Sequence, residues 1–426
     1  MPSRRALLRA LGVSVAVGAA GCNESADGDG TPTQPPTETP TATLTATRTK
    51  TPTRTPASET PTATETSTPA ETPTPKAAES AETPALTTGE SVDRFGRSVA
   101  LSQEAAIVLA ADSGAYAFAP DDGWADPVVL TSNEGDGFGD HGASAALVGN
   151  LAVLGSPGAG AAYLFERTAD GWVQHHQFSP DVEEDTNEFG RSIAFDSERV
   201  VVGDVNDPSP MVERSGRACV FSGDGTDWAR DATLGTDAEE FFGTAVAVDG
   251  DVVLVGAVHA EVDGERTGAV YVYERSDGAW QRQARLVPAD PSGIESFGQS
   301  VALDGDTAVV GASASDTGHA YVFARTGGDW VLQEQLTVRG LESGADFGQS
   351  VAITGGSAVV GAPYAGETGR AYVFEEAAEW ALSRRFGAVD LPENAEFGFD
   401  VAQSDETVLV GAPAYRNTTG AYLLDL

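Results

Sequence analysis

Cysteine is almost absent from this sequence of 426 residues. The only two are Cys22 and Cys219. Cys22 lies at the end of an apolar leader, where we expect it to carry lipid, so Cys219 has no partner within the chain. The sequence therefore offers no disulfide framework.

Lysine and positive charge are also scarce. Both lysines, Lys50 and Lys76, lie in one Thr/Pro-rich stretch, and the formal net charge is -39. Such an acidic surface repels nucleic acid phosphates and anionic lipid headgroups, so we expect no nucleic acid partner. At molar salt the Debye length falls to about 3 Å, which screens the self-repulsion. The charge therefore predicts a salt-loving host.

Catalytic and metal-binding signatures are missing. The sequence contains no G-x-S-x-G, no H-E-x-x-H and no cysteine cluster. His141, His259 and His319 occur singly, while His175 and His176 are neighbours on a predicted strand and so point to opposite faces. We therefore predict that the protein is not an enzyme.

No apolar run is long enough to cross a bilayer, which needs about 20 residues. The longest, residues 11–20, follows "SRRALLR", in which Arg4 and Arg5 resemble the twin-arginine export signal of an archaeal-type leader. "AAGC" resembles a lipobox that ends at Cys22. We interpret residues 1–22 as a cleaved leader with a lipidated cysteine. The alternative is a plain secretory signal with an incidental cysteine.

Bulky apolar residues are nearly absent from residues 23–82, which consist mostly of Thr, Pro, Ala, Ser and Glu. Such a segment buries too little apolar surface to offset its ordering entropy, so we interpret it as a disordered stalk. The predicted N-glycosylation sites are Asn23 and Asn417. Residues 83–426 remain for folding.

What this remainder does contain is a repeat. Seven Phe-Gly pairs recur in phase, at Phe95, Phe138, Phe189, Phe242, Phe297, Phe347 and Phe397. Each begins a unit with four short segments rich in Val, Ala and Tyr, which read as strands. Repeats of about fifty residues indicate propellers or solenoids. We predict an all-β, seven-bladed propeller of four-stranded antiparallel blades, with Cys219 as a buried thiol where sister units have tyrosine.

The tryptophans suggest how the ring closes. Each of the six begins the fourth segment of units one to six, whereas unit seven ends at "GAYLLDL" without a fourth segment. Residues 84–88 have the position of a fourth strand with no unit of their own. We predict that this N-terminal strand pairs with the strand ending near Leu426 and completes the last blade.

Phe-Gly followed by an apolar run into "VGAP" resembles the FG-GAP repeat, which builds the seven-bladed propeller of integrin alpha subunits. The likeness extends over residues 83–426 and implies a role in binding at a cell surface. Several integrin blades bind calcium in a D-x-D-x-D-G loop, but this chain has "VDGDV", "LDGDT" and "ITGGS" there. These read as two-residue hairpin turns with positive φ at both positions, too short to surround calcium. We therefore expect no cofactor, the acidic run of residues 181–188 being the one alternative cation site.

Loop length indicates the binding face. The longest loops between second and third strands are residues 204–215 and 258–267, in units three and four, and insertions that break a repeat often map to the working face. The alternative is neutral variation in loop length. The candidate ligand-binding residues are Asn206, Asp207, Met211, His259, Glu261 and Arg266.

Together these features predict a non-catalytic β-propeller, attached by lipid to the extracellular face of the cell membrane, that binds a protein or glycan of the envelope. Two alternatives stay open. The propeller could be an extracellular carbohydrate-active enzyme, because fold does not determine function. It could also have a purely structural role in the envelope.

Overall fold

The computed structural model describes residues 13–15, 79–80, 85–88, 92–111, 114–135, 137–138, 143–180, 188–205, 216–236, 240–388, 391–413 and 420–426. They belong to a compact unit made of Met1–Gly18 and Pro75–Leu426, and a second unit covers Ala19–Thr74. The predicted export signal at Arg4 and Arg5, the lipidation site Cys22 and the sequon at Asn23 lie outside the described residues. Among the described residues, no helix is long and apolar enough to cross a membrane.

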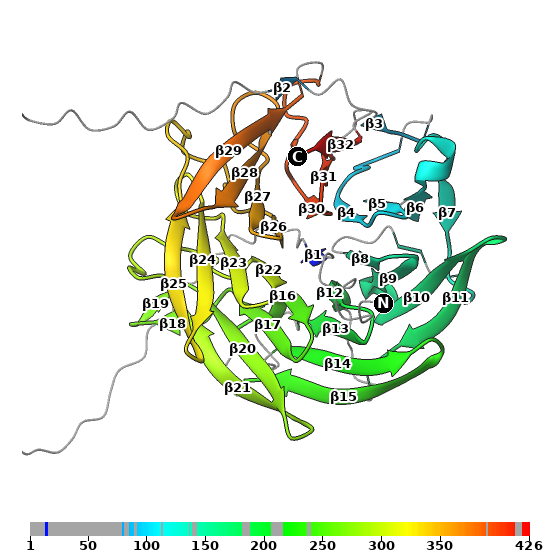
Figure 1. Ribbon diagram of the computed structural model, residues 1–426, viewed down its shortest axis with the longest axis horizontal. Coiled ribbons are helices and arrows are strands. Elements are labelled where there is room, and N and C mark those ends of the chain that lie inside the picture. The colour runs from blue at the N-terminus through cyan, green and yellow to red at the C-terminus, as the bar shows by residue number, and fades with distance from the viewer. Residues whose placement is uncertain are drawn as a thin grey trace, which may run out of the picture. The chain divides into compact units, whose positions relative to one another are not determined.

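Seven antiparallel sheets stand around a common centre, which confirms the predicted propeller (Figure 1). In each blade the first strand of the Phe-Gly unit lies innermost, and the later strands follow outward. The strands of blades 1 to 3 are β4 (Ser98–Leu101), β5 (Ala106–Ala110), β6 (Gly114–Phe118), β7 (Val128–Leu130), β8 (Ala145–Val148), β9 (Leu151–Ser156), β10 (Ala161–Thr168), β11 (Gly171–Phe178), β12 (Phe189–Phe195), β13 (Arg199–Asp204), β14 (Arg217–Asp224) and β15 (Asp227–Gly235).

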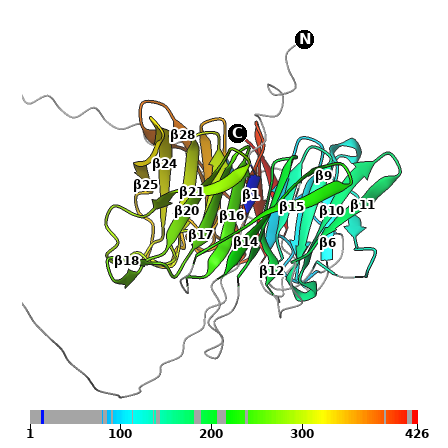
Figure 2. The same cartoon turned by 90° about the horizontal axis from the view of Figure 1, so that it is seen from below.

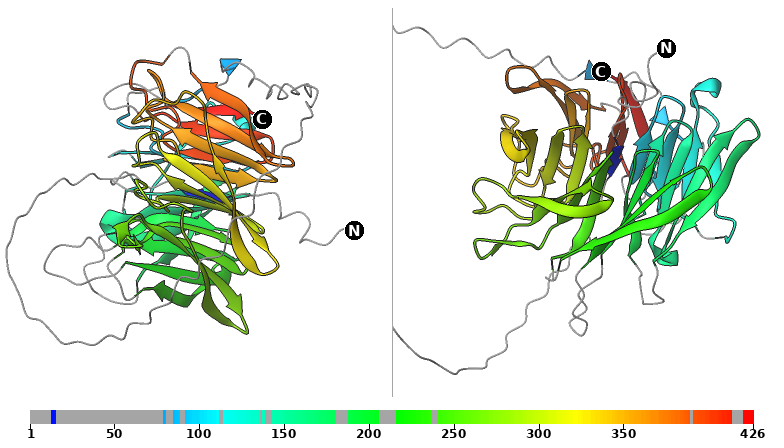
Figure 3. Two further views of the ribbon diagram at one scale, coloured as in Figure 1. Left: turned by 90° about the vertical axis from the view of Figure 1, so that its left-hand side faces the viewer. Right: turned by 60° about the horizontal axis from the view of Figure 1, so that its bottom comes forward.

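The strands of blades 4 to 7 are β16 (Phe242–Asp249), β17 (Val252–Ala257), β20 (Ala269–Ser276), β21 (Ala279–Leu286), β22 (Ser300–Asp304), β23 (Thr307–Ala312), β24 (His319–Thr326), β25 (Asp329–Leu336), β26 (Val351–Thr354), β27 (Ser357–Ala362), β28 (Arg370–Glu376), β29 (Trp380–Gly387), β30 (Val401–Gln403), β31 (Thr407–Gly411) and β32 (Ala421–Asp425). Side views show the sheets side by side, with their inner strands turned to the centre (Figures 2 and 3).

The ring closes as predicted. Strand β3 (Ala85–Leu86) pairs antiparallel with β32, placing Ala85 opposite Tyr422 and Leu86 opposite Ala421. Leu86 is fully buried in the cluster between blades 7 and 1. The last blade is therefore built from both ends of the propeller sequence, which covers the edge that β32 would otherwise expose.

Two short strands add to complete blades. Strand β1 (Val13–Val15) pairs antiparallel with the inner strand β22, with Val13 opposite Leu303, and lies at the centre of the ring. Strand β2 (Glu79–Ser80) runs parallel to the outer strand β29. These residues fall in the predicted leader and stalk, and neither pairing was predicted from the sequence.

The Phe-Gly pair explains how neighbouring blades pack. Each phenylalanine is buried and contacts aromatic rings of its own blade, as Phe347 does edge-to-face with Tyr372, with ring centroids 5.7 Å apart. The glycine lets the backbones of adjacent blades approach closely. A Cβ atom at Gly361 would overlap the carbonyl oxygen of Gly398, the glycine of the next Phe-Gly pair. The two glycines are therefore a steric requirement of the ring.

Five of the six tryptophans lie in outer strands as predicted, whereas Trp124 precedes β7 by four residues and has a positive φ of 67°.

Cys219 is buried without a disulfide partner, and burial raises the pKa of its thiol. In blade 2 a register shift leaves His175 as a bulge residue between Gln174 and His176. His176 stacks on Phe178, with ring centroids 4.7 Å apart, while His175 Nε2 lies 2.7 Å from Glu166.

The turns between first and second strands join neighbouring blades. Asp249 Oδ2 accepts a hydrogen bond from the Gly305 N–H of blade 5 at 2.6 Å, and Asp304 Oδ2 accepts one from the Gly355 N–H of blade 6 at 2.6 Å. These carboxylates therefore cap the next turn. The prediction of positive φ at both turn positions is correct for Gly355 and Gly356, whereas in the Gly250–Asp251 turn only Gly250 has positive φ, 56°.

A buried carboxylate joins the blades at the closing seam. Asp400 lies two residues after Gly398, where sister units have Ser98, Ser300 and Ser350. Its Oδ1 accepts from the Ser350 hydroxyl at 2.7 Å, and its Oδ2 accepts from the Val99 N–H at 2.7 Å. Asp400 thus connects blades 6, 7 and 1, and burial raises its pKa to about 7.

Candidate ligand-binding face

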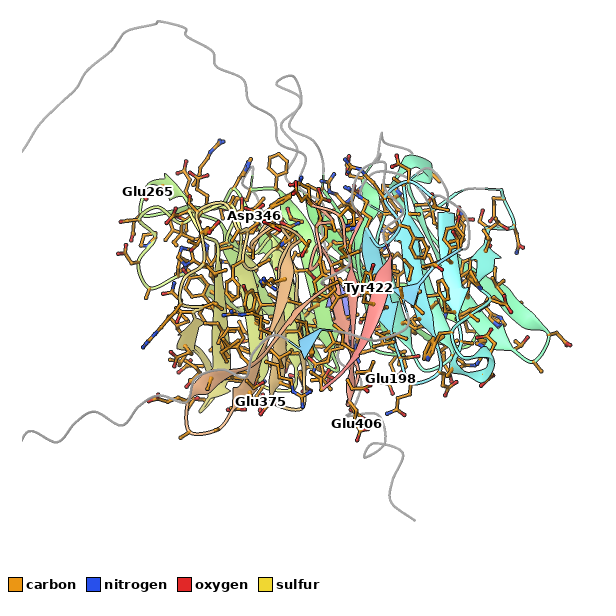
Figure 4. All side chains as sticks on the ribbon, turned by 90° about the horizontal axis from the view of Figure 1, so that it is seen from above. Glu198, Glu265, Asp346, Glu375, Glu406 and Tyr422 are labelled. Carbon is orange, nitrogen blue, oxygen red and sulfur yellow. The ribbon has the colours of Figure 1, made fainter. Side chains whose placement is uncertain are left out.

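The propeller has two faces with different kinds of loops. One carries the loops between second and third strands and the turns that lead into each Phe-Gly pair, and we call it the Phe-Gly face. The other carries the two sets of hairpin turns, and we call it the hairpin face. Figure 4 shows Glu265 and Asp346 at the Phe-Gly face, and Glu198, Glu375 and Glu406 at the hairpin face.

Three of the six predicted ligand-binding residues belong to the described structure, and all three lie on the Phe-Gly face. His259, Glu261 and Arg266 come from the long loop of blade 4. This loop folds into a small hairpin of β18 (Glu261–Val262) and β19 (Glu265–Arg266). Asn206, Asp207 and Met211 from blade 3, and the sequon at Asn417, fall outside the described residues.

The hairpin is fixed to the turn that precedes its own Phe-Gly pair. The His259 ring packs on Phe241, with centroids 4.2 Å apart, and the His259 N–H donates to the Glu240 carbonyl at 3.1 Å. Burial, with the nearby positive charge of Arg266, lowers the pKa of His259. At neutral pH the imidazole is therefore neutral and serves as packing for the hairpin.

Beside this hairpin lies a pocket of about 580 Å³, which we call the rim pocket. Its polar lining residues are Glu240, Glu261, Tyr271, Arg282, Gln283 and Arg285. Of the three predicted residues that the structure describes, only Glu261 lines it. His259 packs on Phe241, next to the lining residue Glu240. Arg266 is exposed on the hairpin.

Tyr271 organises the floor of the rim pocket. Its hydroxyl donates to Glu240 Oε2 at 2.6 Å, and the guanidinium carbons of Arg282 and Arg285 lie 5.7 and 5.6 Å from its ring centroid. Arg285 Nη2 also donates to the Glu261 carbonyl at 2.7 Å. Burial and the Glu240 carboxylate raise the pKa of Tyr271 to about 12, so the phenol stays protonated. Two cations and one carboxylate are thereby held around one ring.

Residues with a strained backbone conformation also lie on this face. The residue immediately before the Phe-Gly pair has positive φ in five blades, although none of the five is glycine. These residues are Arg94 (50°), Phe241 (52°), Ser296 (59°), Asp346 (54°) and Glu396 (60°). A non-glycine residue in this region costs on the order of 1 kcal/mol or more and persists only where surrounding structure enforces it.

Three of these strained residues belong to a second group, the central cluster, made of Arg94, Arg97, Asp346, Tyr364 and Glu396. The Tyr364 hydroxyl lies 3.5 Å from Glu396 Oε1. Burial raises the pKa of Asp346 to about 6 and also raises that of Glu396. Burial and both carboxylates raise the pKa of Tyr364 to about 12.

Arginine balances these carboxylates. The guanidinium carbon of Arg97 lies 5.6 Å from the centroid of Phe399, and burial and the charges of Arg94 and Arg191 lower its pKa. The central cluster was not predicted from the sequence. The available signal was the variable residue in front of each Phe-Gly pair, where a regular repeat would keep one side chain.

Comparison with known proteins agrees with this architecture. Residues 235–273, 280–323 and 330–374 each match the model of the FG-GAP repeat. The chain therefore contains three FG-GAP repeats within a propeller of seven blades. The matched stretches cover most of blades 4 to 6, and the rim pocket lies within the first two.

Solved structures resemble this propeller at low identity. They include the computationally designed Ika8 protein (14% identity, TM-score 0.46, covering 80% of this chain and 99% of that one). A protein from Lactobacillus plantarum has 16% identity and a TM-score of 0.48, covering 78% and 88%. Sqt1 of Saccharomyces cerevisiae has 12% identity and a TM-score of 0.46, covering 80% and 88%. No curated protein matches the sequence.

Proposed function

We propose that this FG-GAP propeller is a non-catalytic binding protein of the cell envelope, which recognises a protein or glycan through its Phe-Gly face at blade 4. The observation that carries the proposal is the rim pocket. An inserted hairpin, a tyrosine, two arginines and a glutamate surround one cavity there. Cavities with a few convergent polar groups are the usual form of a binding site.

The cellular setting of the proposal comes from the sequence. The twin-arginine motif at Arg4 and Arg5, the lipobox at Cys22 and the Thr/Pro-rich residues 23–82 support a propeller held on a stalk at the extracellular face of the membrane. The net charge of -39 supports a host that lives in high salt. We propose membrane attachment through lipid alone.

Exchange of loops between blades tests the function. Replacing residues 258–267 of blade 4 by the shorter blade 5 loop, residues 313–317, removes the hairpin and opens the rim pocket. The matched control places the blade 6 loop, residues 363–368, into blade 5. In pull-downs from native envelope at high salt, we expect the blade 4 exchange to lose the partner and the control to retain it. Equal capture by both variants, or no capture by the wild type, would contradict the proposal.

A second candidate function rests on the central cluster. Asp346 and Glu396 are carboxylic acids with raised pKa values beside Tyr364, and such groups mark acid–base sites. A carbohydrate-active enzyme would use this pair to cleave a glycosidic bond. Burial and its carboxylate neighbours raise the pKa of Tyr364 to about 12, which argues against a nucleophilic role for this tyrosine. Turnover of an envelope polysaccharide that disappears in Glu396→Gln would favour the enzyme.

A further inference from the structure

We infer that the rim pocket of blade 4 binds the carboxylated sugars of an acidic glycan, with Arg282 and Arg285 receiving the carboxylate and Glu240 receiving a ring hydroxyl. This inference rests on the proposed binding function and names the chemistry of its ligand.

A bulge brings the two arginines together. Residues three apart in a regular strand point to opposite faces. In the pairing of β20 with β21, however, Val272 lies opposite Ala284 and Tyr273 opposite Arg282, which leaves Gln283 as an extra residue. The bulge turns the strand so that Arg282 and Arg285 share one face and both approach the Tyr271 ring.

The arginines are fixed in place yet keep donors for a ligand. Arg285 uses Nη2 for the Glu261 carbonyl, and Arg282 forms no hydrogen bond or ion pair with any part of the chain that the structure describes. Stacking on Tyr271 orders both guanidinium groups before a ligand arrives. A planar guanidinium matches a carboxylate through two parallel N–H···O bonds, so this pair suits a carboxylate better than a neutral sugar.

The lining of the rim pocket also offers an acceptor. Glu240 receives the Tyr271 hydroxyl on Oε2, while its Oε1 accepts no hydrogen bond from the described residues. A carboxylate oxygen in this position suits a sugar hydroxyl, which donates. The amide of Gln283, also in the lining, can both donate and accept. Cations and an acceptor in one lining match a uronic acid, which carries a carboxylate and hydroxyls on one ring.

A glycan fits this lining better than an acidic polypeptide does. Peptide recognition depends on aromatic or aliphatic anchors in apolar pockets. Among the described residues that line it, the only apolar aliphatic one is Ala284, and the Tyr271 ring is covered by the two arginines. The rim pocket therefore offers hydrogen bonds and charge but little surface for an apolar anchor.

Only blade 4 combines these groups. At the positions of Arg282 and Arg285, blade 2 has Gln174 and Gln177, blade 3 has Arg230 and Thr233, blade 5 has Leu332 and Gln335, and blade 6 has Leu382 and Arg385. Blade 6 also has Ala345 at the position of Glu240. Arg385 stacks on Tyr372 at 5.4 Å, as the arginines of blade 4 do on Tyr271, which makes it a matched control without the ligand groups.

The net charge is compatible with an anionic ligand at high salt. With a Debye length of about 3 Å at 1 M salt, repulsion from distant carboxylates is screened, and only groups in direct contact with the ligand count. The local arginine pair then decides whether a carboxylate binds.

Calorimetric titration with oligogalacturonate, a defined uronic acid oligomer, and with its neutral methyl ester tests the inference. The full chain is used in molar NaCl, in wild-type form and as three variants: Arg282→Gln/Arg285→Gln, Glu240→Gln and the control Arg385→Gln. We expect the wild type and the control to bind the oligouronate alike. The double arginine variant should bind at least tenfold more weakly, Glu240→Gln severalfold more weakly, and the methyl ester not measurably to any form. Arg282 and Arg285 are exposed and Arg385 is half-buried, and an unchanged melting temperature verifies that each variant folds.

Three outcomes would overturn the inference. The methyl ester could bind as well as the oligouronate, the double arginine variant could bind like the wild type, or poly-glutamate could bind more tightly than the uronate and compete with it at the same residues. Failure of the uronate to bind, while the loop-exchange variant still loses envelope capture, would refute the ligand class and leave the binding function standing. If the uronate fails to bind and the loop-exchange variant also retains envelope capture, the binding function is refuted as well.

Discussion

The two faces of this propeller are built from the same repeat but carry different kinds of loops. On the hairpin face the turns between first and second strands are short in all seven blades, and aspartates such as Asp249 and Asp304 hold the next turn in place. On the Phe-Gly face the corresponding loops differ in length, and the residue before each Phe-Gly pair changes from Arg94 to Phe241 to Glu396. Side chains of these short turns bond one blade to the next, while varied residues lie around the rim pocket and the central cluster. This difference indicates that one face maintains the ring and the other is available for recognition.

The largest effect is expected where the ring is joined. Deletion of residues 83–88 removes β3 and exposes the buried core around Leu86 and the edge of β32. We expect the melting temperature, followed by circular dichroism at high salt, to fall sharply, since losing the single leucine side chain alone costs about 2–5 kcal/mol. Deletion of six residues at 60–65 is the length-matched control. An unchanged melting curve would show that the N-terminal strand does not close the ring.

The seam carboxylate predicts a pH dependence. The folded pKa of Asp400, about 7, lies above its unfolded value of about 3.9. A raised pKa means that the native state holds the proton, so the stability that this group contributes is present below about pH 4 and is lost as the pH rises through about 7. Three pKa units correspond to about 4 kcal/mol.

Asp400→Asn should remove this dependence. Chemical denaturation of the variant and the wild type between pH 4 and pH 8 measures the effect as the difference between their unfolding free energies. We expect the variant to gain relative to the wild type as the pH rises. Ser350→Ala, which removes a hydrogen bond to Asp400 but no charge, is the control and should give a smaller change with pH. Parallel curves for Asp400→Asn and the wild type would contradict the assignment.

Substitutions at two glycines distinguish a steric requirement between blades from a conformational requirement in a turn. A Cβ at Gly361 would overlap the Gly398 carbonyl, while one at Gly250 meets open space. Gly361→Ala should therefore destabilise the ring by about 3 kcal/mol through overpacking. Gly250→Ala should cost only about 1 kcal/mol, through its positive φ. Equal losses in equilibrium denaturation would show that close approach between blades does not limit this fold.

The smallest effect on stability is expected at the rim pocket. Arg282→Gln/Arg285→Gln changes exposed side chains at the outer edge of blade 4, and such changes usually alter the free energy of unfolding by no more than about 0.5 kcal/mol. We expect denaturation midpoints that match the wild type. A loss as large as that of Gly361→Ala would mean that the arginines maintain the fold, which would remove the contrast between the two faces.

The architecture could be predicted because several sequence signals agree. Seven in-phase Phe-Gly pairs gave the number of blades, and six tryptophans with an unpaired segment at residues 84–88 gave the closing strand. These signals repeat, so an error at one unit is corrected by the others. The use of Asp249 was not predicted, since its hydrogen bond reaches a blade 56 residues away.

The binding site was predicted only in part. Loop length led to Glu261 and its hairpin, but strict alternation along a strand places Arg282 and Arg285 on opposite faces, so the pair could not be recognised. The bulge at Gln283 that brings them together depends on the pairing with β20. The central cluster was missed for a related reason, because its members come from blades 1, 6 and 7 and meet only when the ring is closed.

Amide hydrogen exchange with and without a captured envelope fraction, at high salt, tests the division between the two faces most directly. We predict protection in residues 240–241 and 258–267 and in strand β21, with little change at the turns around Gly250, Gly305 and Gly355. Protection confined to those turns, with blade 4 of the Phe-Gly face unchanged, would contradict the account.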